Sequence, residues 1–254
     1  MLLDWPSISG INACMTERHG GVSAAPWDSM NLGSHVGDDP LAVARNRQLL
    51  AQTIAARPVF MDQVHGVHVL ALAQDTPDGL QADACWTQQP GVACTVMVAD
   101  CLPVLLCDDR GQWVAAAHAG WRGLAGQQGQ GVLESLWQQL QAQGAQAAHT
   151  RAWLGPCIGP QAFEVGPEVR EAFVQNGLDL AAYFKPQPDG RFLADLAGLA
   201  RWRLQQLGIG QFEGNSSQPE WCTVAQPSRF FSHRRDSRVL GTTGRMAACI
   251  WLDR

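Results

Sequence analysis

ACTVMVADCLPVLLCD (residues 93–108) and QWVAAAHAG (residues 112–120) decide the fold of this chain. Both stretches are almost entirely apolar and have the length of buried strands, and the sequence DDRG that joins them is typical of a turn. The two stretches therefore predict a β-hairpin.

The register of this hairpin brings two reactive side chains together. If Cys107 pairs with Gln112 across a four-residue turn, the same register places Cys101 opposite His118. Directly opposed residues of an antiparallel pair have Cβ atoms about 4.5–5.5 Å apart, so a thiolate and an imidazole could share one metal ion or one proton. A slip of one residue would send the two side chains to opposite faces, and the geometry is therefore a hypothesis about register.

The sequence on either side of the hairpin predicts further strands and a loop. PVFMDQVHGVHVLAL (residues 58–72) is rich in β-branched and apolar residues and indicates two strand segments that meet at His65-Gly66. RAWLG (residues 151–155) indicates a short strand, and MAACIWL near the C-terminal end indicates a buried one. Residues 15–40 hold many Gly, Ser, Asn, Asp and Pro residues and predict a long ordered loop, a kind of loop that often carries function.

Three segments repeat apolar residues at helical spacing. The first predicted helix begins at Asp39-Pro40, the second follows Gly123 and ends at Gly144, and the third covers residues 194–207. Strands and helices therefore both contribute to the fold.

Length and composition fit one globular domain. The chain has 254 residues, of which 46% are hydrophobic and 16% charged, which allows a large core and excludes a disordered, highly charged chain. We therefore expect an α+β fold, with a mixed β-sheet flanked by helices, that forms a single domain over residues 1–254.

The charge balance favours small-molecule partners. A formal net charge of −5 gives no general attraction to nucleic acid or anionic lipid, whose protein partners carry basic patches. No apolar run approaches the roughly 20 residues of a membrane helix, and the start MLLDWPSISG lacks the features of a signal peptide. We expect no nucleic-acid partner, no membrane partner and a cytoplasmic location, and the sequence selects no oligomeric state.

Eight cysteines are scattered through the chain without CxxC spacing, which excludes zinc-ribbon and thioredoxin-type motifs. In a reducing compartment most of them should be free thiols that pack as small apolar side chains. Only a cysteine with special neighbours, such as Cys101, is a candidate for function.

His65 is the candidate for a third ligand beside Cys101 and His118. It lies at a Gly-associated break in a predicted strand, where another segment or a ligand can approach closely. Two His and one Cys make an acceptable zinc set, and catalytic zinc is typically held by three protein ligands. Spacing alone leaves three interpretations open: a metal site, a nucleophilic Cys-His pair, and ordinary packing.

Short motifs along the chain point to a known family. From about residue 16 to the C-terminus they are, in order, NLGSHVGDDP, QVHG, VADCLPVLL, AHAGWRG, WLGPCIGP, and FFSHRR with TGRMA. In these motifs the chain resembles the YfiH-type family, also called multicopper polyphenol oxidase or laccase-domain proteins. The resemblance covers nearly the whole chain and is highly specific.

The resemblance implies a zinc-binding purine nucleoside phosphorylase that also has adenosine deaminase and methylthioadenosine phosphorylase activity. It implies metal ligands at the His of QVHG, the Cys of ADC and the His of AHAGWRG, which are His65, Cys101 and His118 in this sequence. Two residues depart from the family's usual pattern: Cys157, which we interpret as core or as a neighbour of the ligands, and His233, which precedes the paired arginines. We expect neither to be a fourth ligand.

Phosphorolysis has two substrates, inorganic phosphate and a purine nucleoside. The expected nucleosides are adenosine, inosine and methylthioadenosine. Phosphate binding favours forked cationic donors, so the candidates are Arg45, Arg47, Arg234 and Arg235. The alternative for each arginine is a surface or structural ion pair.

Deamination would need a proton carrier. Zinc would lower the pKa of a bound water toward about 7, and the hydroxide would attack C6 of adenine. Asp62 and Asp100 lie near the ligands in sequence, but in a regular strand Asp100 would point away from the face of Cys101, so the role stays unassigned. Asp38 and His35 are candidates for contacts to substrate. The alternative for Asp38 is to cap a turn, and the alternative for His35 is to pack within the loop.

Three other functions compete with the phosphorylase. The family's older name suggests a copper-dependent polyphenol oxidase (laccase), although seven mostly dispersed histidines are few for several copper sites. The second is a Cys-His hydrolase that edits misbuilt cell-wall nucleotide precursors, with Cys101 as nucleophile. The third is a purine-binding or partner-binding protein without enzymatic activity, in which zinc is structural.

Overall fold

The two apolar stretches at the centre of the sequence contribute strands to two different β-sheets. Residues 93–108 contain β6 (Leu102–Asp108) and all but the first residue of β5 (Val92–Val98), and the chain crosses from one sheet to the other between these strands. β7 (Val114–Ala119) then pairs with β6 in antiparallel. Every residue of the three strands is buried, since both faces of each sheet are covered, and the strands are therefore apolar without alternation.

The computed structural model describes residues 3, 5, 7–175 and 178–253. Its other strands are β1 (Ile11–Met15), β2 (Arg57–Phe60), β3 (Val69–Ala71), β4 (Ala84–Thr87), β8 (Thr150–Leu154), β9 (Glu164–Val165), β10 (Phe184–Pro186), β11 (Phe192–Ala194), β12 (Gln211–Gly214) and β13 (Met246–Leu252). One sheet has the order β1-β13-β5-β2, a second has the order β12-β8-β6-β7-β4-β3, and a small third sheet has the order β10-β11-β9. The two large sheets are mixed, because β2 is parallel to β5, β3 to β4 and β12 to β8.

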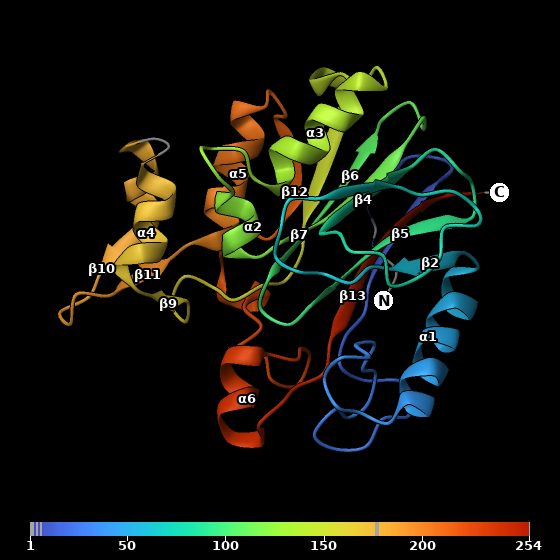
Figure 1. The fold of residues 1–254 in the computed structure, drawn as a ribbon, viewed down its shortest axis with the longest axis horizontal. Helices are drawn as coiled ribbons and strands as arrows, with labels where there is room; N and C mark the ends of the chain where they lie inside the picture. The colour runs from blue at the N-terminus through green and yellow to red at the C-terminus, as the bar shows by residue number, and fades with distance from the viewer. Residues whose placement is uncertain (1–2, 4, 6, 176–177, 254) are drawn as a thin grey trace.

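Helices cover the outer faces of the two large sheets. The described residues form α1 (Pro40–Ile54), α2 (Trp121–Ala125), α3 (Val132–Ala142), α4 (Pro167–Val174), α5 (Leu196–Gln206) and α6 (His233–Leu240), with 3-10 helices at Ala147–His149, Leu178–Tyr183 and Pro219–Trp221. Figure 1 shows α1 beside β2 on one side of the molecule, α3 and α5 on the other, and α4 with β9–β11 at one edge. No helix in this part of the chain combines the length and apolar character that crossing a membrane requires.

Three hydrophobic clusters hold these layers together. The first packs one face of the six-stranded sheet against the helices α3 and α5. It includes Leu106 of β6 and Leu136 of α3. The second fills the space between the two sheets and includes Leu105 and Val96. The third joins the far face of the four-stranded sheet to α1 through Leu50. The order of layers is therefore helices, sheet, sheet, helix.

The predicted α+β class with mixed strand pairing and flanking helices is confirmed, and its strands are divided between two stacked sheets. The predicted helix start is also confirmed, because the Asp39 carboxylate accepts the N–H of Leu41 at the N-terminus of α1. α5, β8 and β13 lie within two residues of their predicted segments, and residues 16–39 form neither helix nor strand. The single helix predicted after Gly123 is two helices, α2 and α3, because the chain turns at Gly126 with a φ of 62°.

The predicted hairpin register is wrong by two residues, because the turn lies one residue later than expected. The N–H of Asp108 donates to the carbonyl oxygen of Trp113 (3.1 Å), so the four-residue turn covers residues 109–112. The Asp108 carboxylate stabilises this turn by accepting two of its N–H groups. Cys101 is consequently not paired with His118, but a shift of two residues preserves the face of the sheet on which each side chain lies.

Leu105 tests the packing between the two sheets. Its side chain is 0% exposed, and truncation leaves a cavity between two rigid layers. We expect Leu105→Ala to lower the free energy of unfolding by about 2–5 kcal/mol, measured by urea denaturation. The matched control is Leu41→Ala, since Leu41 is 79% exposed; it should change the free energy by less than about 0.5 kcal/mol. Equal losses in the two variants would contradict a core between the sheets.

Candidate metal centre

Three potential metal ligands meet where three segments of the chain converge. His65 lies in the loop between β2 and β3, Cys101 lies directly before β6, and His118 lies in β7. Their ligand atoms all lie within 4.8 Å of one another, and Cys101 Sγ is 3.6 Å from His65 Nε2. The two imidazole rings meet edge to face, with centroids 4.8 Å apart. Among the residues that the structure describes, this is the one group of three or more His, Cys, Asp or Glu side chains with such a geometry.

Gly120 leaves the space in which the ligands meet. It is the N-cap of α2, directly after β7, and its φ of −66° is accessible to any residue. A Cβ atom here would lie 2.8 Å from His65 Cδ2 and 3.0 Å from Cys101 Sγ. The glycine is therefore needed for the close approach of the ligands and not for its backbone freedom.

A buried carboxylate stabilises the loop that carries His65. The φ of His65 is 60°, a left-handed conformation that side chains other than glycine rarely adopt. The Asp83 carboxylate accepts the N–H groups of Val64 (3.2 Å), His65 (2.9 Å) and Gly66 (2.7 Å). These hydrogen bonds offset the cost of the backbone conformation that places the His65 ring near Cys101.

The same carboxylate orients His118. Asp83 Oδ1 lies 2.8 Å from His118 Nδ1, and the His118 N–H donates to the Asp83 carbonyl oxygen (2.7 Å). Nδ1 is thereby engaged, and Nε2 is left as the ligand atom. Burial would raise the pKa of Asp83, but His118 and the N–H groups of Gly66 and His65 lower it. Sequence reasoning missed Asp83, whose signal was a charged residue directly before the apolar segment ACW.

The electrostatics of the site favour a thiolate. Burial would raise the pKa of the Cys101 thiol, but the adjacent His118 and His65 rings lower it to about 6. Burial would lower the pKa of His118, but the Cys101 and Asp83 side chains raise it. All eight cysteines are free thiols, and Cys101 alone among them is not buried.

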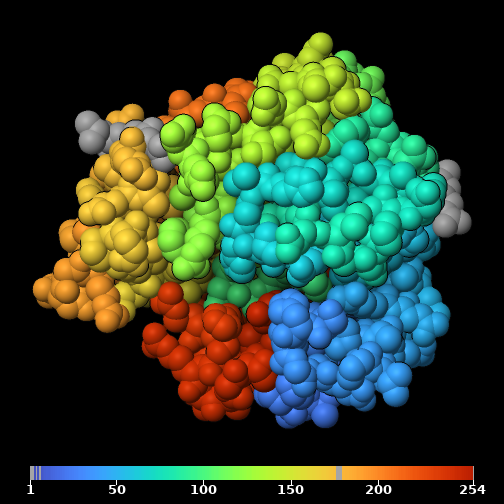
Figure 2. Space-filling view, in the orientation of Figure 1, coloured from blue at the N-terminus to red at the C-terminus, as the bar shows by residue number. Residues whose placement is uncertain are grey.

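The three ligands line a cavity of about 400 Å³. In Figure 2, a shadowed recess lies where the red segment around α6, the blue N-terminal loop and the cyan-to-green segments meet. The cavity is lined by His35, Gln63, His65, Met97, Ala99, Asp100, Cys101, His118, Trp121, Arg122, Ile158, Phe163, Leu196, His233, Arg234 and Arg245.

Three of the four arginines proposed for phosphate lie outside this lining. Arg45 is exposed on α1 and donates to Gln48 (2.7 Å). Arg47 stacks on the Phe60 ring, 4.0 Å from its centroid, and donates to a main-chain carbonyl oxygen. Both candidate side chains are thus engaged outside the cavity lining.

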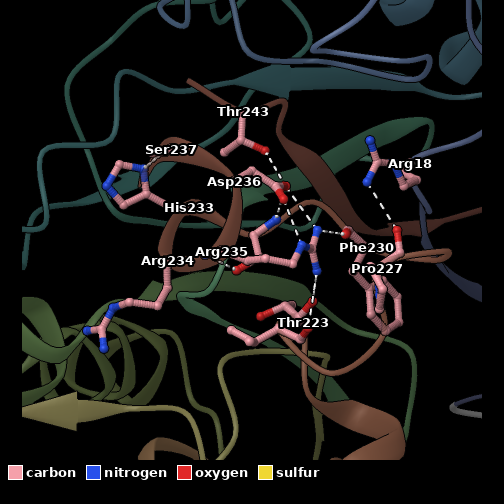
Figure 3. A network of polar contacts seen from close by, with 12 residues as sticks. Arg18, Thr223, Pro227, Phe230, His233, Arg234, Arg235, Asp236, Ser237 and Thr243 are labelled. Carbon is pink, nitrogen blue, oxygen red and sulfur yellow. Dashed lines mark hydrogen bonds and ion pairs between the residues drawn. The ribbon is translucent and has the colours of Figure 1, made fainter. Parts of the chain in front are cut away.

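The paired arginines of FFSHRR have different environments. Arg235 donates to the Asp236 carboxylate and to the carbonyl oxygens of Thr223 and Phe230, so it connects α6 to the preceding loop. Arg234 lines the cavity, and Figure 3 shows its side chain pointing away from the Arg235 network. Of the four candidates, Arg234 is therefore the one that the structure places in the cavity.

The cavity contains two further arginines, Arg122 and Arg245, which were not identified as candidates from the sequence. Arg122 stacks on the ring of Trp121, 4.4 Å from its centroid, and Arg245 directly precedes β13. None of the cavity arginines, Arg234 included, forms an ion pair with a carboxylate in the described part of the chain. The signal lay in two motifs: AHAGWRG contains Arg122 together with the ligand His118, and TGRMA contains Arg245.

Asp100 joins α6 to the metal ligands. Its φ of 89° shows that the chain here is not a regular strand, so the strand geometry assumed for Asp100 does not apply, and the residue lines the cavity. Its carboxylate accepts the hydroxyl of Thr223 (2.5 Å) and the N–H of Arg234 (2.6 Å). Asp100 thus fixes the start of α6 beside Cys101.

The other residues left open by the sequence are separated in the structure. His35 lines the cavity, whereas Asp62 lies outside its lining. Asp38 is buried and accepts from Ser23 (2.6 Å) and Asn31 (2.8 Å), which agrees with a structural role in its loop.

Known proteins resemble this chain along its whole length. The family model described as multi-copper polyphenol oxidoreductase laccase matches residues 12–253. The purine nucleoside phosphorylase of Pseudomonas aeruginosa is 50% identical, and the purine nucleoside phosphorylase YfiH of Escherichia coli is 46% identical, each over 98% of this chain and 96% of the relative. This chain belongs to the YfiH family.

Solved structures of YfiH-family proteins agree with this fold. The crystal structure of a Neisseria meningitidis protein, 42% identical, superposes with a TM-score of 0.87 and covers 100% of this chain and 99% of that one. The crystal structure of YfiH from Bacillus licheniformis, 30% identical, has a TM-score of 0.88 and covers 98% of this chain and 94% of that one.

Of the two residues noted as departures from the YfiH pattern, His233 lines the cavity and Cys157 does not. Cys157 is buried in the hydrophobic core, where its Sγ atom lies 3.3 Å from Asn215 Nδ2, and it is not among the grouped ligands. His233 lines the cavity, and its Nδ1 atom is 2.8 Å from the hydroxyl of Ser237. Neither residue belongs to the group of three potential ligands.

Gly120→Ala should separate the ligands with little effect on the fold. The new Cβ atom would push His65 and Cys101 apart, so we expect zinc affinity to fall by about tenfold or more, measured by competition with a chromogenic chelator. Gly210→Ala is the control, because nothing lies within 4 Å of its Cβ position. Unchanged zinc affinity in Gly120→Ala would contradict a site built from these ligands.

Asp83→Asn should weaken the site through orientation. The variant keeps the shape of the side chain but replaces one carboxylate oxygen with an N–H₂ group, which cannot accept from His118 and all three loop N–H groups. We expect zinc affinity to fall by about 10- to 100-fold, measured with the same chelator. The control is Asp189→Asn, because Asp189 is exposed and lies outside the cavity lining; this variant should leave the affinity unchanged.

Proposed function

We propose that this protein is a purine nucleoside phosphorylase with a zinc ion held by His65, Cys101 and His118. One observation carries the proposal: a single cavity combines this ligand group with Arg122, Arg234 and Arg245, and none of these arginines forms an ion pair with a carboxylate among the residues that the structure describes. Relatives that bear the name purine nucleoside phosphorylase and are 40–50% identical support it.

The donor set fits zinc. Thiolate and imidazole are common zinc ligands, and the lowered pKa of Cys101 makes the thiolate available. Three protein ligands and an adjoining cavity leave room for a further ligand, as in catalytic sites. When bound, zinc supplies Lewis-acid chemistry that no side chain of the cavity provides.

The cavity residues would divide the work of phosphorolysis. A phosphate oxygen forms a bond to C1′ of the ribose while the bond from C1′ to the purine nitrogen breaks, and its electron pair leaves with the purine. The guanidinium groups would hold and orient the phosphate, with Arg234 retained as a candidate contact. Apolar wall residues such as Ile158 and Phe163 would pack against the nucleoside and exclude water.

Adenosine, inosine and methylthioadenosine are the proposed substrates, and adenosine deamination is a proposed second activity. Both reactions would use the same cavity, because the described residues contain one ligand group. The free cysteines fit a reducing compartment, and we therefore place the protein in the cytoplasm.

A copper-dependent polyphenol oxidase is the less favoured activity. The name of the matching family model suggests it. Multicopper oxidation needs several metal sites, whereas the described residues bring together one group of three ligands.

A Cys-His hydrolase is the second candidate, because Cys101 Sγ lies 3.6 Å from His65 Nε2 and its pKa is lowered to about 6. The cell-wall nucleotide precursors considered above would then be its substrates. Alkylation by iodoacetamide during chelation separates the two proposals. Loss of an amidase activity upon labelling of Cys101, with no effect of zinc removal, would favour the hydrolase.

Release of ribose 1-phosphate from inosine and inorganic phosphate tests the proposed function. We expect zinc-loaded protein to form the product, chelation to abolish it, and added zinc to restore it. In the absence of phosphate, adenosine should yield inosine and ammonia. Cys101→Ser and His118→Ala should lose more than about 99% of both activities, because each removes one of three ligands.

The interpretation of this test depends on controls for folding and metal. Each variant should keep the circular dichroism spectrum of the parent chain, so that lost activity reports on the site. A well-folded, zinc-loaded sample that forms neither ribose 1-phosphate nor inosine would overturn the proposal. Stoichiometric copper together with robust phenol oxidation would favour the laccase.

A further inference from the structure

Arg245 has a guanidinium group with free donors in the cavity. Its Nη1 atom donates to the carbonyl oxygens of Thr243 (3.1 Å) and Gly244 (3.2 Å), within its own turn. Its Nε and Nη2 atoms have no hydrogen-bond partner, and the group has no ion-pair partner, among the residues that the structure describes. The side chain therefore presents unused N–H donors, and its charge is balanced only by Cys101 and Asp100, with which it forms no ion pair.

The loop that carries the motif NLGSH is shaped around this arginine. Asn31 Oδ1 accepts the N–H groups of Arg245 (2.8 Å) and Gly33 (2.9 Å). A Cβ atom on Gly33 would lie 2.7 Å from Arg245 Cγ, so the arginine side chain lies directly across this glycine. The side chain is thus held in one place, which reduces the entropy that an incoming ligand must remove.

His35 follows in the same loop and lines the same cavity. Its ring has no hydrogen-bond partner in the described part of the chain, so one ring N–H is available to a ligand. Partial burial, followed by the positive charge of Arg245, lowers the pKa of His35. The lower pKa favours a neutral imidazole, which donates without adding a second charge.

The other cavity arginines are engaged differently. Arg234 donates to the carbonyl oxygens of Ala162 (3.4 Å) and Glu164 (3.0 Å), which are main-chain groups of another segment. Arg122 stacks on Trp121. Burial lowers the pKa of Arg245, so its charge is partly desolvated, and an anion would offset that cost.

We infer that Arg245 and His35 form the subsite that binds a phosphate oxyanion in this cavity. The inference rests on the proposed function and deepens it, because it assigns the anion to residues of NLGSH and TGRMA instead of the paired arginines. The oxyanion is either inorganic phosphate or the ester phosphate of a nucleotide. Guanidinium forks recognise both through charge-assisted hydrogen bonds.

Arg245→Met tests the subsite, and Arg238→Met is the matched control, since Arg238 is exposed at the end of α6. Binding of inorganic phosphate and of AMP is measured by isothermal titration calorimetry, and KM for phosphate and for inosine by initial rates. We expect Arg245→Met to weaken phosphate binding and raise KM for phosphate by about 10- to 100-fold, with KM for inosine within about twofold. Arg238→Met should match the parent chain.

A second variant guards against loss of the fold. Arg245→Lys keeps the charge but not the fork, so it should restore part of the phosphate affinity. Unaltered phosphate and AMP binding in a folded Arg245→Met variant would overturn the inference, as would an equal loss in Arg238→Met. Loss of AMP binding alone would identify an ester phosphate as the occupant. Phosphate binding that depends on Arg245, in a protein that releases no ribose 1-phosphate, would sustain the subsite and reject the phosphorylase.

Discussion

The carboxylate of Asp83 is the interaction on which the rest of the site depends. It accepts three N–H groups of the His65 loop and faces Nδ1 of His118, so one buried group fixes two ligands from separate segments. Full burial is costly for an unpaired carboxylate, but here each hydrogen bond lowers that cost. The carboxylate therefore couples the left-handed turn at His65 to the orientation of a strand residue in β7.

The crossing between the two sheets supplies the third ligand. β5 and β6 belong to different sheets, and the chain turns between them at Asp100 with a φ of 89°. Cys101 follows this turn and lies directly before β6, where Gly120 leaves it space beside His65. The same turn lets Asp100 fix α6 against the cavity. A rigid two-sheet core thus positions side chains that irregular segments carry.

Buried strands and capped helices were predictable, because their signals are local. The apolar runs of β6 and β7 and the cap at Asp39 are written in adjacent residues. The register was not predictable, since it depends on how the Asp108 carboxylate stabilises its turn. Of the ligands, Cys101 and His118 followed from the hairpin even with the register wrong, because a shift of two residues keeps the face. His65 was only weakly indicated by its Gly-associated strand break and rested mainly on the family resemblance, since its position depends on Asp83 in another segment.

Local charge explains why the proposed phosphate contacts could not be predicted from composition. The chain carries a net charge of −5, yet Asp100 is the one acidic residue of the cavity lining and its carboxylate is already engaged. The guanidinium groups of the lining come from α2, from α6 and from the turn before β13. The adjacent arginines of FFSHRR suggested a joint phosphate contact. However, neighbouring residues of a helix point in different directions, as Arg234 and Arg235 do in Figure 3. Folding therefore brings into one cavity three arginines that lie far apart in the sequence, inside a protein that is acidic overall.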